Sequence, residues 1–215
     1  VDLAMVTHAM RAGVSDALRA ELGDDFFEEG FVLACTHTHS SPGGCGHEAM
    51  YNIVTPGFVP EHLEAVVTAC VGAILEARAT AAPTTLELTD AVFPPTAEVA
   101  WNRSLASYLR NPEAVHRSKD ETHLAIDRRM NVLTARREGA PASLLSLFGV
   151  HCTSLGNTLD RHDGDNKGYA AAKAEATLAA GGVNGPVAIF AQATAGDVSP
   201  HYHGPGDIAR RKKIT

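Results

Sequence analysis

The sequence predicts an α/β domain: a mixed or mostly parallel sheet flanked by helices, with a metal site at the C-terminal ends of the strands. The main observation is that stretches with helical spacing of apolar residues alternate with short apolar runs, several of which end in polar residues. The 215 residues are 45% hydrophobic and 20% charged, a composition typical of globular proteins. Because no repeat or linker is visible and the first residues read like the end of a strand, residues 1–215 are interpreted as part of a single domain, incomplete at both ends.

Three segments are predicted as helices, because each repeats apolar or alanine residues at helical spacing. Glycine or proline follows each segment and predicts where it ends, at Gly23, at Pro83 and at Gly181-Gly182. The predicted helices are residues 8–22, 61–80 and 169–180.

Five segments are predicted as strands from apolar runs or alternation. A turn at Glu138-Gly139 joins two of them into a hairpin. The polar stretches 101–121 and 156–168 are predicted as loops, the first with one short helix. The predicted strands are residues 31–35, 84–93, 129–136, 144–151 and 187–191.

Charge and composition argue against several classes of protein. The formal net charge of −7 argues against a nucleic-acid partner, and the basic run at 210–213 is interpreted as a solvated surface. No stretch reaches the roughly 18 apolar residues of a membrane span, and no signal peptide is visible. Cys35 and Cys152 are interpreted as buried free thiols; a disulfide, and with it the redox compartment, stays undecided.

The strongest local signal is His37-Thr38-His39, at the end of the apolar run 31–35. In a strand, residues i and i+2 point to the same face, so both imidazoles can converge on one ion. Zinc binds neutral imidazole nitrogen at about 2.0–2.1 Å. Surface or hydrogen-bonded core histidines are the alternative interpretation of this pair.

A third histidine, His151, ends the apolar run that begins at Leu144. Ligands of open α/β sheets bind beyond the carboxyl ends of the strands, so two strands that end in histidine can place three imidazoles in one crevice. Three protein ligands and one open position are the usual format of a catalytic zinc site. His37, His39 and His151 are therefore the predicted zinc ligands.

The turn Gly196–Pro200 follows another predicted strand and carries two candidate residues. Ser199 is either a nucleophile or a hydrogen-bonding contact, and Asp197 is a carboxylate that can fix Ser199 or a ligand histidine from behind. Alternatively, both simply hold the turn. No GxSxG elbow occurs, so an α/β-hydrolase has no support.

Five blocks, THTHS-SPGG, WNRS, GVHCTS, DNKGYAAAKAE and AGDVSP, together resemble the neutral/alkaline ceramidase family in their order. The resemblance runs from Val1 to Ser199. It implies a catalytic domain of a secreted or membrane-associated zinc amidase that cleaves the N-acyl bond of ceramide to sphingosine and a fatty acid. It also implies zinc on the three histidines, completed by a Glu and a Tyr further along, beyond Thr215.

The resemblance assigns further roles residue by residue. Arg103 of WNRS corresponds to an active-site arginine, where a guanidinium can stabilise an oxyanion; a loop salt bridge is its alternative. Ser199 matches the family's essential serine. Gly44 belongs to the SPGG loop, and Asn166 with Lys167 opens the helix at 169–180, where capping is the favoured role.

The chain also departs from the family pattern, and this leaves the substrate open. The departures are Ser41, Cys45-Gly46, His162-Asp163-Gly164 and His201-Tyr202-His203, the last interpreted as solvent-exposed. The expected partner is ceramide or another N-acyl amide, with possible peripheral membrane contact. The rival interpretations are a non-catalytic metal- or lipid-binding homologue and an amidohydrolase-type barrel, which needs eight strand–helix units.

Overall fold

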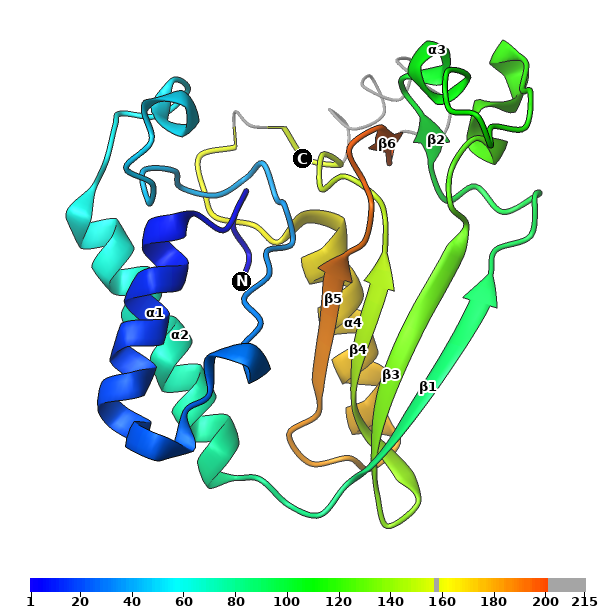
Figure 1. Ribbon diagram of the computed structural model, residues 1–215. Helices are drawn as coiled ribbons and strands as arrows, with labels where there is room; N and C mark the ends of the chain where they lie inside the picture. The colour runs from blue at the N-terminus through cyan, green and yellow to red at the C-terminus, as the bar shows by residue number, and fades with distance from the viewer. Residues whose placement is uncertain (157–158, 201–215) are drawn as a thin grey trace.

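The computed structural model describes residues 1–156 and 159–200, which form a sheet with one helix on its face and a pair of helices beside it (Figure 1). The α-helices are α1 (His8–Leu22), α2 (Pro60–Ala79), α3 (Leu105–Tyr108) and α4 (Asp165–Ala180). Short 3-10 helices are η1 (Gly23–Asp25), η2 (Glu28–Gly30), η3 (Ala49–Asn52) and η4 (Lys119–Leu124). The strands are β1 (Thr85–Val92), β2 (Trp101–Asn102), β3 (Arg129–Arg137), β4 (Ala140–Phe148), β5 (Val187–Gln192) and β6 (Val198–Ser199).

The main sheet has the strand order β1-β3-β4-β5, and β2 pairs with β6 in a separate two-stranded ribbon. The pairs β1–β3 and β3–β4 are antiparallel, and β4–β5 is parallel. Glu138 and Gly139 both have positive φ, which is the requirement of the tight hairpin turn that joins β3 to β4. The prediction of a mixed sheet is confirmed, and the mostly parallel alternative is wrong because this hairpin and β1 fix antiparallel neighbours.

Helix α4 makes the crossover between the parallel strands β4 and β5 and covers one face of the sheet (Figure 1). Ser146, Phe148 and Ala188 are buried on that face. On the opposite face Leu88 and Ile189, at the two ends of a row across the four strands, are 73% and 53% exposed.

Helices α1 and α2 pack against each other around Val14, Leu18 and Cys70. Thr7 caps α1 by accepting the N–H of Met10, and α1 ends at Gly23 as predicted. Pro60 opens α2, where its missing N–H costs nothing. Among the described helices, none combines the length and the apolar character that a membrane crossing needs.

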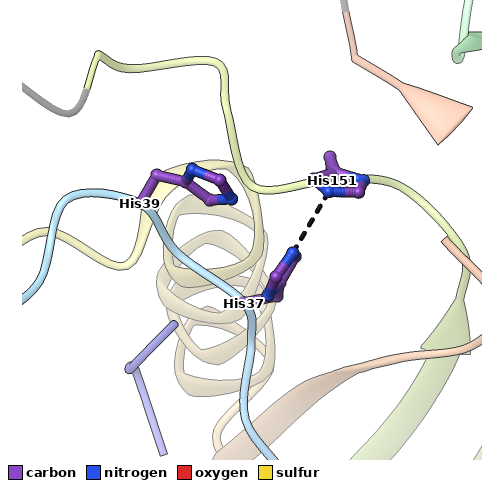
Figure 2. A group of neighbouring side chains, drawn as sticks. All are labelled: His37, His39 and His151. Carbon is purple, nitrogen blue, oxygen red and sulfur yellow. Dashed lines mark hydrogen bonds between the residues drawn. The ribbon is translucent and has the colours of Figure 1, made fainter. Parts of the chain in front are cut away.

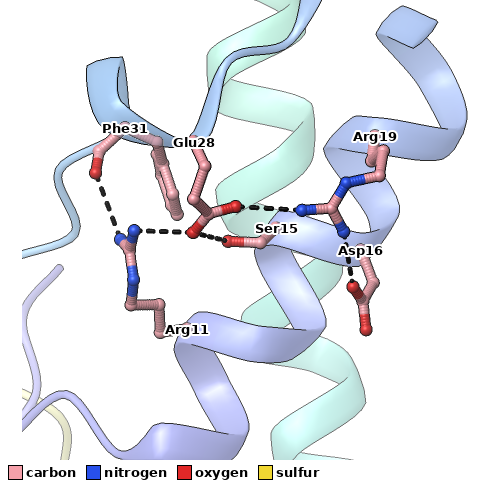
Figure 3. A network of polar contacts seen from close by, with 6 residues as sticks. All are labelled: Arg11, Ser15, Asp16, Arg19, Glu28 and Phe31. Atoms are coloured by element: carbon pink, nitrogen blue, oxygen red, sulfur yellow. Dashed lines mark hydrogen bonds and ion pairs between the residues drawn. The ribbon is translucent and has the colours of Figure 1, made fainter.

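A polar cluster ties η2 and the residue that follows it to α1 (Figure 3). The carboxylate of Glu28 accepts bonds from Arg11 at 2.7 Å, Ser15 at 3.1 Å and Arg19 at 3.1 Å. Arg11 also donates to the carbonyl of Phe31 at 3.1 Å. These bonds therefore fix the position of Glu28 and Phe31 against α1, and with it the start of the segment that leads to His37.

Three predicted boundaries are corrected. Residues 31–35 belong to no strand; the Phe31 carbonyl binds Arg11 at 3.1 Å, and the Ala34 carbonyl accepts from the ammonium of Val1 at 2.8 Å. The strand predicted at 144–151 ends at Phe148. Helix α4 begins at Asp165 and not at 169, since the Asp165 carboxylate accepts the N–H of Ser154 and Leu155 and so orders the start of this polar stretch.

Candidate metal centre

Three imidazoles meet where two irregular segments run side by side (Figure 2). The first segment carries His37 and His39, and the second follows β4 and carries His151. An isolated parallel bridge joins Thr38 to Cys152, and His39 N–H donates to Cys152 O at 3.2 Å. One ring nitrogen from each histidine lies within 4.8 Å of those of the other two.

The pair His37 and His39 converges for a different reason than the sequence predicts. Their segment is not a strand, and His37 has a φ of 65°, in the left-handed region that side chains rarely adopt. The conformation costs about 1–3 kcal/mol. Hydrogen bonds offset this cost, because His37 N–H donates to Leu3 O at 3.1 Å and the ring Nδ1 to Ala4 O at 2.5 Å.

The hydrogen bonds of two rings define which nitrogen is free. His37 Nδ1 faces the carbonyl of Ala4 at 2.5 Å, and His151 Nδ1 faces the carbonyl of Ala195 at 2.6 Å. A carbonyl only accepts, so each Nδ1 carries the hydrogen and each neutral ring keeps its lone pair on Nε2. These two Nε2 atoms are 3.1 Å apart. Two acceptors face each other, an arrangement that a shared cation stabilises.

The donor set and spacing fit zinc. Two ligands of a tetrahedral zinc at about 2.0–2.1 Å stand about 3.3 Å apart, close to the spacing of these two nitrogens. A second ring nitrogen that donates to a backbone carbonyl is also what metal-bound histidines commonly have.

The pKa values of two of the rings are shifted toward the form that binds metal. Partial desolvation lowers the pKa of His39, although this residue is exposed at the surface, and the neighbouring His37 adds to this effect. Burial also lowers the pKa of His151; the bond to Ala195 opposes the change and Arg103 reinforces it. A lowered pKa favours the neutral ring, which is the state with a free lone pair.

Arg103 lies at the edge of the cluster, directly after β2. Its guanidinium donates to Gly196 O at 2.8 Å and, with the His151 lone pair on Nε2, also to that nitrogen at 3.3 Å. Its backbone N–H donates to Asp197 O at 2.8 Å. The structure thus places this cation beside the histidines, and the donors that remain can face a bound molecule.

The two residues predicted in the turn after β5 lie on the ribbon β2–β6. Ser199 is paired with Trp101 and is buried, and the carbonyl of its neighbour Val198 accepts His151 N–H at 3.0 Å. The Asp197 carboxylate accepts a bond from the buried Asn102 at 2.7 Å. The Nδ1 atoms of His37 and His151 use carbonyls instead, so Asp197 holds the ribbon that carries Arg103.

Asn166 and Lys167 do not cap α4; the N-cap residue is Gly164. The Asn166 side chain donates to His151 O at 2.8 Å and to Ser154 Oγ at 3.1 Å. The buried Lys167 ammonium donates to Phe148 O at 2.6 Å and to Ala191 O at 3.3 Å. Asn166 therefore supports the His151 segment, and Lys167 ties β4 to β5.

A cavity of about 500 Å³ opens beside His37 and His39. Gly44 lines it with a φ of 92°, and a Cβ there would meet the carbonyl of Gly57 at 2.9 Å. Sequence reasoning missed the apolar wall, since no pattern connects the N-terminal residues to the loop after His39. Apolar residues of this wall are Leu3, Met5, Met10, Pro42, Val54 and Pro56.

Three of the positions that depart from the family pattern, Ser41, Cys45 and Gly46, line this cavity. The Cys45 thiol lies 3.2 Å from His62 Nδ1. Burial raises the pKa of Cys45. His162 binds the carbonyl of Asp2 at 2.6 Å. All four cysteines are free thiols in the described residues. Residues 201–203 and the basic run at 210–213 lie outside the described residues.

The fold and cluster define a mixed α/β domain with a three-histidine centre beside the ends of β4 and β5. Residues 1–212 match the neutral/alkaline non-lysosomal ceramidase family, N-terminal region. The chain belongs to this family.

Curated relatives and solved structures agree with this membership. Neutral ceramidase of Pseudomonas aeruginosa is 37% identical over 94% of this chain, and neutral ceramidase B of Dictyostelium discoideum is 34% identical over 95%. A solved ceramidase complexed with C2 superposes with a TM-score of 0.84 at 36% identity, covering 94% of this chain and 30% of that one. The chain spans 29% and 28% of the length of the two relatives.

Proposed function

We propose that this chain holds the zinc centre of an amide hydrolase, with His37, His39 and His151 as ligands. The observation that carries the proposal is the pair of Nε2 lone pairs 3.1 Å apart, each fixed by an Nδ1 bond to a carbonyl. The Arg103 guanidinium donates to the His151 lone pair at 3.3 Å, and a cation shared by both nitrogens would relieve the remaining repulsion between the two lone pairs. The lowered pKa values of His39 and His151 favour the same neutral state.

The chemistry proposed is hydrolysis of an N-acyl amide bond. A bound zinc supplies Lewis acidity and lowers the pKa of a coordinated water to about 7. The residues of the chain hold the substrate in place and stabilise the negative charge that develops on it. Arg103 donates toward the oxygen that becomes negative when the amide carbonyl is attacked. In this proposal Ser199, which lies buried on the ribbon next to Val198, whose carbonyl binds the His151 N–H, contacts the polar head of the substrate or acts as a nucleophile.

The proposed substrate is ceramide or a related N-acyl lipid. The cavity beside His37 and His39 has walls that are mostly apolar, which suits a hydrocarbon chain near the centre. The relatives bear the name neutral ceramidase, and a solved one is a complex with C2. Peripheral contact with a membrane, where such lipids reside, belongs to the same proposal.

The proposal is tested by metal analysis together with a hydrolysis assay. Wild-type protein that also carries the downstream Glu and Tyr implied by the family resemblance is expected to bind one zinc and to release fatty acid from a short-chain fluorescent ceramide. His37→Ala is expected to lose both, by more than the roughly 10–100-fold that follows the loss of an outer partner. His116→Ala, at an exposed position, is the matched control and is expected to keep both.

Two results separate the rivals. Retained activity in His37→Ala contradicts the zinc mechanism. Stoichiometric zinc without hydrolysis of any N-acyl amide, in protein that carries those downstream residues, favours the non-catalytic homologue.

A further inference from the structure

The side chain of Gln192, the last residue of β5, connects the two segments that carry the histidines. Its Nε2 donates to Thr36 O at 2.9 Å and to Val150 O at 2.6 Å. Its Oε1 accepts Val150 N–H at 3.2 Å. The orientation of the amide is determined, because a backbone N–H needs an acceptor and the two carbonyls need donors. One side chain thus binds three backbone groups.

The bound groups stand directly before the proposed ligands. Thr36 precedes His37, and Val150 precedes His151. Beyond His37 and His151, the segments meet again where the N–H of His39, the third proposed ligand, donates to Cys152 O at 3.2 Å. The facing rings of His37 and His151 therefore lie between two cross-links, one made by backbone and one made by Gln192.

The anchor of this cross-link is rigid. Gln192 is paired with Phe148 at the end of the parallel β4–β5 ladder. Asn166 differs, because its bond to His151 O supports one segment only. The side chain of Gln192 thus binds both the His37 segment and the His151 segment, and its backbone belongs to the sheet.

We propose that Gln192 is a positioning residue of the metal centre, which sets the separation of the two Nε2 atoms of His37 and His151. The inference rests on the proposed function. Without the amide, Thr36 and Val150 lose their shared partner, and the two rings are free to separate from the 3.1 Å spacing. Zinc affinity then falls, because the ligands no longer stand at the tetrahedral distance in advance.

The test compares Gln192→Met with Lys167→Met in the intact protein. Lys167 also ties β4 to β5, through Phe148 O and Ala191 O, but it does not bind the two ligand segments. Zinc affinity is measured by competition with a chromophoric chelator. Coordination geometry is measured from the visible absorption of the Co²⁺-loaded protein. Thermal melting of the metal-free protein reports folding.

Gln192→Met is expected to bind zinc about 10–100-fold more weakly and to change the Co²⁺ spectrum. Lys167→Met is expected to lower the melting temperature and to leave affinity and spectrum at wild-type values. Gln192→Glu, of nearly the same shape, keeps an acceptor for Val150 N–H and loses the two donors, so the same weakening is expected.

Wild-type affinity and spectrum in a folded Gln192→Met or Gln192→Glu protein overturn the inference and leave the proposed function intact. Failure of both variants to fold assigns Gln192 a general structural role and also overturns it. Failure of the wild type itself to bind zinc or Co²⁺ overturns the proposed function, and the inference with it.

Discussion

The helices α1 and α2 and the segments that carry the histidines satisfy their backbones in opposite ways. The helices bond within themselves, and their ends are set by nearby residues such as Thr7 and Pro60. The histidine segments have little regular structure, and distant side chains such as Gln192 and Asn166 hold their carbonyls. Local interactions therefore build the frame, by which we mean the helices and the main sheet. Long-range side-chain hydrogen bonds build the site.

This comparison predicts that substitutions at the site change chemistry more than stability, and that substitutions in the frame do the reverse. Among substitutions that leave the three proposed zinc ligands in place, the largest expected effect is at Arg103. Arg103→Met is expected to lower kcat by about 10²–10³-fold, as loss of an oxyanion donor does, with little change in KM or zinc content. Steady-state kinetics and metal analysis check this.

Arg103→Lys keeps the charge and is expected to recover only part of the rate, since its single ammonium cannot bind Gly196 O and a substrate in the same geometry. Zinc loss in step with the loss of rate would instead assign Arg103 to support of His151.

A smaller effect is expected at Lys167, inside the frame. Burial lowers the pKa of Lys167 to about 8. The folded protein then releases this proton at lower pH than the unfolded chain. The contribution of Lys167 to the free energy of unfolding therefore rises from about pH 8 to about pH 10.5 and is lost again as pH falls. The wild type should gain on the order of 1–3 kcal/mol relative to Lys167→Met over this range.

Urea unfolding at pH 7 and pH 10 measures this difference. The Cys152 thiol, whose pKa burial raises to about 12, is present in both proteins and is common to the comparison. Lys173→Met, at an exposed position of the same helix, serves as the control and should track the wild type at both pH values. A constant gap between wild type and Lys167→Met would contradict the lowered pKa.

The smallest effect is expected at the polar cluster on α1. Glu28→Gln weakens the partly exposed bonds from Arg11 and Arg19 and should lower the free energy of unfolding by less than about 1 kcal/mol. The difference should vanish in high salt, because exposed ion pairs are screened. The neighbouring Glu29→Gln is the control, and an equal loss there would show that the ion pairs of Glu28 contribute nothing of their own.

The frame could be predicted from sequence because its signals are local. Gly23 sits where α1 ends, and the Glu138-Gly139 pair supplies the turn that fixes a hairpin. The helix predicted at 61–80 is found at Pro60–Ala79, and it ends before Pro83, the residue predicted to stop it. The start of α4 was missed because the polar Asp165 reads as loop, whereas its carboxylate binds N–H groups ten and eleven residues away in sequence.

The meeting of the three histidines could be predicted from strand ends, but its cause could not. The positive φ of His37 and the carbonyls of Ala4 and Ala195 have no pattern in sequence. The role of Gln192 was missed for the same reason, since its partners lie 156 and 42 positions away.

The N-terminal residues serve two purposes at once. Leu3, Ala4 and Met5 line the cavity, and the carbonyl of Ala4 is also the acceptor that holds the proton on His37 Nδ1. The same piece of backbone therefore forms part of the cavity wall and determines the tautomer of His37, a proposed ligand. A change in the shape of that boundary is also a change in the electronic state that His37 offers to an ion.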